Sequence, residues 1–180
     1  MRQCMIGLLA LASTTPLSAQ DAAPRAFAIG ASYLRVYDGD GVALRAEYNL
    51  YLSPRIAIGF PVTLGWSGVT GNPGKRRSLM VGSQVRLEAA AVGRLRPYVG
   101  GSALAISSSV PDYNRLLGPG PVRAHNRIGN EWGYGVSLDA GLGLPVSRKL
   151  GVRLDGRLLY QQVYEGGSDV GWMLGASVAF

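Results

Sequence analysis

The strongest constraint in this sequence is a two-residue alternation of apolar side chains with small or polar ones, which recurs along most of the chain. In residues 169–180, DVGWMLGASVAF, every second residue from Val170 to Phe180 is apolar. Alternation at this period is typical of a β-strand with one apolar face. In a soluble protein, a last strand of this kind would present an exposed, unpaired edge. In a membrane-spanning barrel its apolar face contacts lipid and its edge is paired, so the pattern favours a barrel.

The same alternation predicts seven further strands. Five have one clearly apolar face, and they comprise residues 42–52, 56–66, 79–90, 132–144 and 150–160. Two weaker strands are expected at residues 27–37, where neither face is cleanly apolar, and 98–106, which is rich in Gly, Ala and Ser. Pro61 cannot donate a ladder hydrogen bond, so a β-bulge is expected there. The predicted fold class is all-β, an eight-stranded antiparallel up-and-down transmembrane β-barrel.

The first residues have the pattern of a targeting segment. A basic start at Arg2 is followed by an apolar stretch from Cys4 to Ala12 and by small residues up to Ala19. This order is typical of a secretory signal peptide, and the apolar stretch is shorter than the about 20 residues that span a bilayer. We therefore expect residues 1–19 to be a cleaved signal peptide and residues 20–180 to form one barrel domain. Without Cys4 that domain has no cysteine, and no cofactor or metal site is expected.

Charge distribution and loop lengths narrow the function classes. The formal net charge is +7, but the arginines are scattered through strands and loops, so nucleic acid is not an expected partner. Short turns are expected at residues 53–55, 93–96 and 147–149, and longer connections at 68–78, 107–131 and 163–169. Short periplasmic turns alternate with longer outer loops in this way in membrane barrels. The connection at residues 38–41 is the hairpin-sized exception.

The face opposite the apolar one is mostly Gly, Ala and Ser, which suits the narrow lumen of an eight-stranded barrel. It also carries four arginines and four acids: Arg45, Arg86, Arg153, Arg157, Glu47, Glu88, Asp139 and Asp155. These charges are expected to form an ion-pair network, because an unpaired buried charge is costly. A tight turn at 147–149 would place Asp139 opposite Arg157. We favour a structural plug over the alternatives of an ion path or a catalytic carboxylate pair.

Large aromatic residues fall near the ends of the apolar face. If odd-numbered strands run upward, the two groups are Trp66, Trp132, Tyr160 and Trp172 at the loop end, and Tyr98, Phe27 and Phe180 at the turn end. Aromatic belts at both membrane interfaces are typical of transmembrane barrels. The aromatic positions therefore favour a lipid-facing apolar surface.

These features resemble the small outer-membrane β-barrel family of OmpA-like and OmpX-like domains. The resemblance rests on the alternating strands after a signal peptide, on RPYVGG at 96–101, and on Gly175, Val178 and Phe180 in the last segment. It covers essentially the whole mature chain. It implies insertion into the outer membrane by the barrel-assembly machinery, which recognises an ending of this kind in the family. It implies no single biochemical role, since this barrel hosts several.

The favoured role is non-enzymatic contact through the outer loops. Basic residues expected near lipopolysaccharide phosphates are Lys75, Arg76, Arg77, Arg115, Arg123 and Arg127. The long connection makes residues 107–130 the candidate segment for a protein partner. Outer-membrane lipid and lipopolysaccharide are the other expected partners.

Two other roles remain open. Lipid A deacylases of the PagL type and palmitoyl-transferring enzymes share this barrel, and the deacylases use a histidine with a serine and an acid. The single histidine, His125, lies in a predicted loop, and Arg127 stands where that family has its serine, so only Ser137 and Glu131 leave a rearranged triad open. A narrow pore is the second alternative, against which the long charged side chains in the lumen argue.

Overall fold

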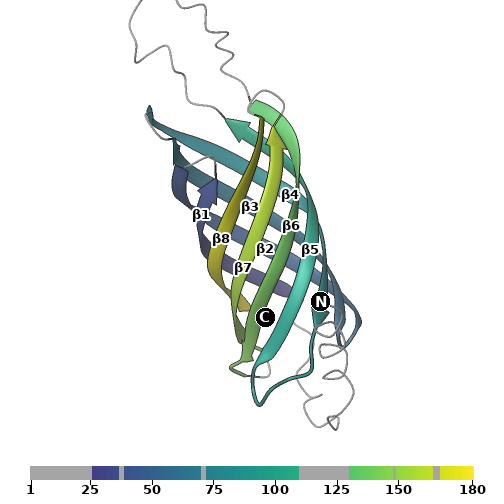
Figure 1. Ribbon diagram of the computed structural model, residues 1–180. Helices are drawn as coiled ribbons and strands as arrows, with labels where there is room; N and C mark the ends of the chain where they lie inside the picture. Colours follow the sequence, from purple (N-terminus) through teal and green to yellow (C-terminus); the bar gives the residue numbers. More distant parts are fainter. Residues whose placement is uncertain (1–25, 37–38, 70–71, 110–129, 148, 164–166) are drawn as a thin grey trace, which may run out of the picture.

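The computed structural model describes residues 26–36, 39–69, 72–109, 130–147, 149–163 and 167–180. In these ranges the chain forms β1 (Phe27–Val36), β2 (Gly39–Ser53), β3 (Ile56–Val69), β4 (Asn72–Glu88), β5 (Arg96–Ser109), β6 (Asn130–Pro145), β7 (Gly151–Val163) and β8 (Gly167–Ala179). Each strand pairs antiparallel with its neighbours in sequence, and β8 pairs with β1, so the sheet is a closed barrel (Figure 1). The predicted eight-stranded antiparallel barrel is confirmed. The described residues include no helix long and apolar enough to cross a membrane.

Short turns connect the strands at the end of the barrel where Phe180 lies, which we call the turn end (Figure 1). In the β2–β3 turn, Ser53 Oγ accepts hydrogen bonds from the backbone N–H groups two and three residues on, at 3.3 and 3.1 Å. Ser147 repeats this contact at the same distances in the β6–β7 turn. In the β4–β5 turn, Gly93 has φ of 62°, a conformation that glycine adopts without steric cost. Local turn chemistry thus holds the register of three hairpins.

At the opposite end, the loop end, the strands are longer than the alternation predicts. β3 ends at Val69 and β4 begins at Asn72, so the expected long connection at 68–78 is mostly a strand pair. β5 and β6 also extend into the expected loop, whose residues 110–129 lie outside the described residues. These extensions carry polar side chains and therefore no apolar alternation, yet backbone hydrogen bonds continue the ladder without it.

The expected bulge at Pro61 is wrong. Gly59 pairs with Gln84 and Val62 with Val81, so the β3–β4 register has the same offset before and after the proline. One missing N–H donor removes a ladder contact but does not require an extra residue in the strand. The strand therefore passes through Pro61 without a shift.

The outward face of the barrel is apolar. On β2, the side chains of Val42, Leu44, Tyr48 and Leu50 are 45% to 59% exposed, whereas Ala43, Arg45, Glu47 and Asn49 point inward. A contiguous exposed apolar surface of this extent is unfavourable in water and fits the hydrocarbon of a bilayer. The only core of the described residues is therefore the lumen.

Candidate functional site: the lumen network and the outer rim

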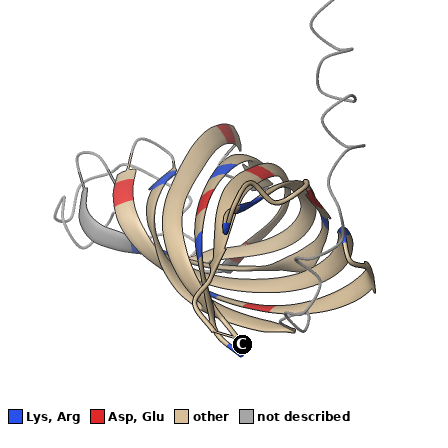
Figure 2. Cartoon of the chain, turned by 90° about the horizontal axis from the view of Figure 1, so that it is seen from below, with Lys and Arg blue, Asp and Glu red and all other residues tan. Residues whose placement is uncertain are grey.

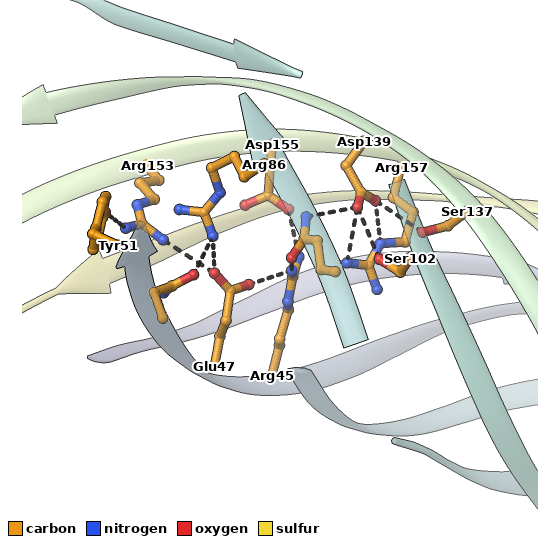
Figure 3. Close-up of polar contacts among 12 residues, drawn as sticks. Arg45, Glu47, Tyr51, Arg86, Ser102, Ser137, Asp139, Arg153, Asp155 and Arg157 are labelled. Carbon is orange, nitrogen blue, oxygen red and sulfur yellow. Dashed lines mark hydrogen bonds and ion pairs between the residues drawn. The ribbon is translucent and has the colours of Figure 1, made fainter. Parts of the chain in front are cut away.

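One carboxylate with three arginines forms the first part of the lumen network (Figure 3). Glu47, 4% exposed, accepts hydrogen bonds from Arg45 and Arg86, and its Oε1 lies 3.4 Å from Nη1 of Arg153. Nη1 of Arg45 also lies 3.5 Å from Oδ2 of Asp155. Viewed from below, acidic and basic positions lie on several strands around the barrel (Figure 2). Because β-strand side chains alternate, charged residues two apart on one strand share the lumen.

A second cluster surrounds Asp139. Its Oδ1 accepts a hydrogen bond from Arg157 Nε, and its Oδ2 accepts from Gln84 Nε2 at 2.7 Å and Ser102 Oγ at 3.1 Å. Ser137 Oγ donates to Oδ1 at 3.2 Å. Asp139 lies opposite Arg157 in the β6–β7 ladder, which is the register that the tight turn at 147–149 predicts. Both carboxylate oxygens are thus fully occupied in a buried site.

Gln84, which is not among the predicted site residues, joins the two clusters. Its Oε1 accepts from Arg45 Nη2 at 2.8 Å, while its Nε2 donates to Asp139. The side chain is fully buried, and it lies two residues from Arg86 on the inward face of β4. Its place between charged residues on the non-apolar face was the signal available in the sequence. The network is therefore continuous across β2, β4, β6 and β7.

Glu88 joins this network through a tyrosine rather than through an arginine. Tyr51 Oη donates to Glu88 Oε1 at 3.5 Å and accepts from Arg153 Nη2 at 3.4 Å. Glu88 makes no ion pair with any residue in the described ranges. Seven of the eight predicted charges therefore form ion pairs, in two clusters that Gln84 joins, and Tyr51 connects the eighth.

The sequence places Tyr98 in the turn-end aromatic belt, and this prediction is wrong. Its side chain is only 8% exposed, and its ring centroid lies 5.0 Å from Cζ of Arg86 inside the lumen. Such a cation–π contact stabilises a buried guanidinium. The segment RPYVGGSALAIS has small residues on both faces, so its alternation does not show which face is inward. The register partner of Tyr98 is Glu88, and register partners point to the same face of the sheet, so Tyr98 points into the lumen as Glu88 does.

An apolar layer closes the lumen on the loop-end side of the charges. It consists of Leu34, Val36, Ala43, Met80, Leu104, Ile106, Leu159 and Met173. On β7, which runs towards the loop end, Leu159 follows Arg157 on the inward face. This layer is not among the features predicted from the sequence, although unbroken apolar runs such as 158–160 interrupt the alternation at these positions. The lumen is therefore sealed by a polar layer and an apolar one.

The other predicted aromatic belt residues lie on the outward face. They are Trp66, Trp132, Tyr160, Trp172 and Phe180. The ring of Trp172 packs against Tyr33 with centroids 5.2 Å apart, and the ring of Phe180 packs against Phe27 at 5.5 Å. Both contacts cross the seam between β1 and β8. Aromatic pairing therefore adds to the hydrogen bonds that close the barrel.

Of the basic residues predicted to contact lipopolysaccharide, three lie on strand β4 and the others lie outside the described residues. Arg76 and Arg77 lie on β4 rather than in a loop, and because neighbours alternate, Arg76 is half-buried and Arg77 exposed. Lys75 is also on β4, but its side chain lies outside the described residues, as do Arg115, Arg123, Arg127 and His125. Arg77 pairs with Trp66 across the β3–β4 ladder. It is thus a cation on the outer wall beside an aromatic residue.

No protein-family model and no curated protein matches the chain. Solved structures match its fold. Neisserial surface protein A is 13% identical, with a TM-score of 0.65 over 86% of this chain and 96% of that one. The N-terminal barrel domain of Pseudomonas aeruginosa OprF is 13% identical, with a TM-score of 0.53 over 86% and 96%. The outer membrane enzyme PagL is 8% identical, with a TM-score of 0.52 over 83% and 97%.

The chain has the fold of the small outer-membrane β-barrels. One of these three proteins is an enzyme, so the outer-membrane barrel fold by itself does not decide between a catalytic and a non-catalytic role.

The described residues of this barrel do not bring Ser137 and Glu131 together. Both point inward from β6, but they are six positions apart, which is about 20 Å along a strand. Ser137 is buried and bonded to Asp139, away from the lipid-facing wall. No group of three or more His, Cys, Asp or Glu in the described ranges is placed to hold a metal ion. The serine that a deacylase needs is therefore not accessible at this position.

Proposed function

We propose that this protein is an exported, non-enzymatic outer-membrane barrel with a plugged lumen, which acts through its loop end. The observation that carries the proposal is that a polar layer and an apolar layer fill the lumen. This filling closes the barrel and leaves no path for a substrate. The apolar outward face supports membrane insertion. The predicted signal peptide at 1–19 supports export, and Gly175, Val178 and Phe180 are proposed as the assembly signal. Outer-membrane fractionation and heat-modifiable gel migration test location and fold.

The loop end is proposed to contact lipopolysaccharide and a protein partner. Arg77 is exposed on the outer wall, and a guanidinium binds phosphate through two parallel hydrogen bonds. The remaining basic residues proposed to act with it are Lys75, Arg76, Arg115, Arg123 and Arg127. The proposed protein contact lies within residues 107–130.

A loop replacement separates these contacts from the fold. Ser109 and Asn130 are opposite each other in the β5–β6 ladder, so an Asn-Gly turn can replace residues 110–129 without changing the register. We expect the variant to keep heat-modifiable migration but to bind purified lipopolysaccharide more weakly, with less dependence on salt. Unchanged binding in the variant would contradict the proposed role of the loop.

A lipid A hydrolysis assay tests the absence of enzymatic activity. We expect the purified protein in detergent to release no fatty acid from lipid A, because Ser137 is bonded within the lumen. The matched variant is His125→Ala, which lies in the replaced loop. Hydrolysis by the natural protein that is lost in His125→Ala would overturn the non-enzymatic proposal.

A further inference from the structure

A hollow of about 730 Å³ lies on the outer wall of the barrel, across β5 to β8. Its floor is a row of register partners in which the small residues Ala140 and Gly156 are flanked by Val99 and Leu174. A further row, towards the loop end, contributes large side chains, with Trp172 on β8. Ligand pockets in proteins typically measure roughly 300–1,000 Å³. This outer-wall hollow is therefore large enough for part of a ligand.

The barrel itself does not fill the outer-wall hollow. A Cβ at Gly156 would meet only a methyl of Leu174 at 3.3 Å and the carbonyl oxygen of Ala140 at 4.0 Å. A larger residue would therefore fit at position 156 with a small shift of Leu174. The chain has glycine there all the same, although glycine weakens a strand. Leu138 and Leu174, which border the floor, are 70% and 58% exposed. The outer-wall hollow is thus an apolar surface that a ligand from the membrane can cover.

A cation lies next to the loop-end border of the outer-wall hollow. Trp172, which lines it, is the register partner of Arg35 on β1 and packs on the ring of Tyr33. The Arg35 side chain is 53% exposed, and its one ion pair with a described residue joins Nε to Asp40 at 3.9 Å. Arg35 is the last exposed residue of β1 before the loop end. Aromatic rings beside a basic side chain are typical of the level at which lipid headgroups lie.

We propose that the outer-wall hollow and Arg35 form a binding site for lipid A, the phosphorylated and acylated anchor of lipopolysaccharide. A phosphate binds the Arg35 guanidinium in place of Asp40, and an acyl chain lies over Gly156 between Leu138 and Leu174. The inference rests on the proposed outer-membrane location, because the loop end then faces the leaflet that contains lipopolysaccharide. It adds a site on the wall that is separate from the proposed loop contacts.

Native mass spectrometry of the detergent-purified full chain, titrated with defined bisphosphorylated lipid A, tests the site. Gly156→Leu fills the outer-wall hollow, and Arg35→Gln removes the cation. We expect each change to weaken the apparent affinity by about tenfold, the equivalent of one charge-assisted hydrogen bond or two buried methylenes. Asp40→Asn, which removes the competing carboxylate, should strengthen binding.

Two control variants match these changes in chemistry. Ala103→Leu enlarges an exposed small residue of β5 outside the outer-wall hollow, and Arg94→Gln removes an exposed cation at the turn end. Both should bind lipid A as the natural protein does. Dephosphorylated lipid A should bind without dependence on Arg35 but with the same dependence on Gly156. Heat-modifiable migration shows that each variant is folded.

Three outcomes would overturn the site. Equal binding by all variants assigns the lipid to the general outer surface. If glycerophospholipid binds with the same affinity and the same dependence on Arg35 and Gly156, the site is not specific for lipid A. If the natural protein forms a dimer that Gly156→Leu abolishes, the outer-wall hollow is the contact site for a second copy of the chain. The variant with residues 110–129 replaced should bind lipid A normally, so failure of the site and failure of the proposed loop contacts are distinguishable.

Discussion

Phe27 and Phe180 exchange two backbone hydrogen bonds at the turn end of the barrel. The N–H of Phe27 donates to the carbonyl oxygen of Phe180 at 3.0 Å, and the N–H of Phe180 donates back at 2.8 Å. From this pair the β1–β8 ladder continues to Arg35 and Trp172. Phe180 and Phe27 therefore form the first residue pair of the seam that closes the barrel.

Phe180→Ala and Phe27→Ala remove the same ring contact from opposite sides of this seam. Each should lower the free energy of unfolding in lipid vesicles by about 0.5–1.5 kcal/mol from the lost aromatic pair, beyond the loss of apolar area. If Phe180 is also part of the assembly signal, only Phe180→Ala should lower the amount of heat-modifiable barrel in the outer membrane of cells. Equal amounts of the two variants in cells would argue against the assembly signal.

Gly141→Ala should destabilise the barrel, whereas Gly143→Ala should not. A Cβ at Gly141 would lie 2.5 Å from the carbonyl oxygen of Leu154 and 2.6 Å from the ring of Tyr98. At Gly143 the nearest atom is 3.5 Å away. Overpacking of this kind costs about 1–3 kcal/mol. Urea unfolding of the two variants measures the difference, and equal midpoints would contradict the tight packing of Tyr98 against Gly141.

Asp139→Ala should cost about 3–5 kcal/mol of unfolding free energy, because it leaves Arg157 buried without its ionic partner. It also removes the acceptor of the Gln84 amide, which joins the two halves of the lumen network. Arg94→Gln at the exposed β4–β5 turn provides the control and should change little. Adding Arg157→Met to Asp139→Ala should restore part of the loss. A double variant less stable than Asp139→Ala would contradict the buried pair.

The apolar layer should be the main barrier to ions. An apolar constriction excludes water and gates by dewetting, whereas a hydrated polar layer does not. We expect no steady currents from the natural protein in a planar bilayer, and small intermittent currents from the double variant Ile106→Ala with Leu159→Ala. Glu47→Gln should remain closed. Steady single-channel currents from the natural protein would overturn the plug.

The matched control for this conductance test removes the same volume from the outward face. Leu154→Ala with Leu158→Ala takes two exposed leucines from β7 and leaves the apolar layer intact. It should show no currents. Currents from this control would indicate general destabilisation rather than opening of the lumen.

Strands with one clear apolar face and turns with specific chemistry could be predicted from the sequence. Strand β2 alternates in the structure as it does in the sequence, and the Ser147 turn places Asp139 opposite Arg157 as expected. Where the alternation is weak the prediction was wrong, as for Tyr98, whose strand has small residues on both faces. The site hypothesis included the charges but not Gln84, because an amide gains its role only from the partners on either side of it.

The sequence by itself determined that this chain forms strands, which faces of most strands are apolar, and which hairpins are tight. These properties depend on residues one to four positions apart, so local patterns determine them. Only the tertiary structure decided that Glu47 lies among three arginines, that Gln84 connects two clusters, and that Leu159 and Ile106 seal the lumen together. Those contacts join strands far apart in sequence, and they depend on the stagger and tilt that eight strands adopt when they close.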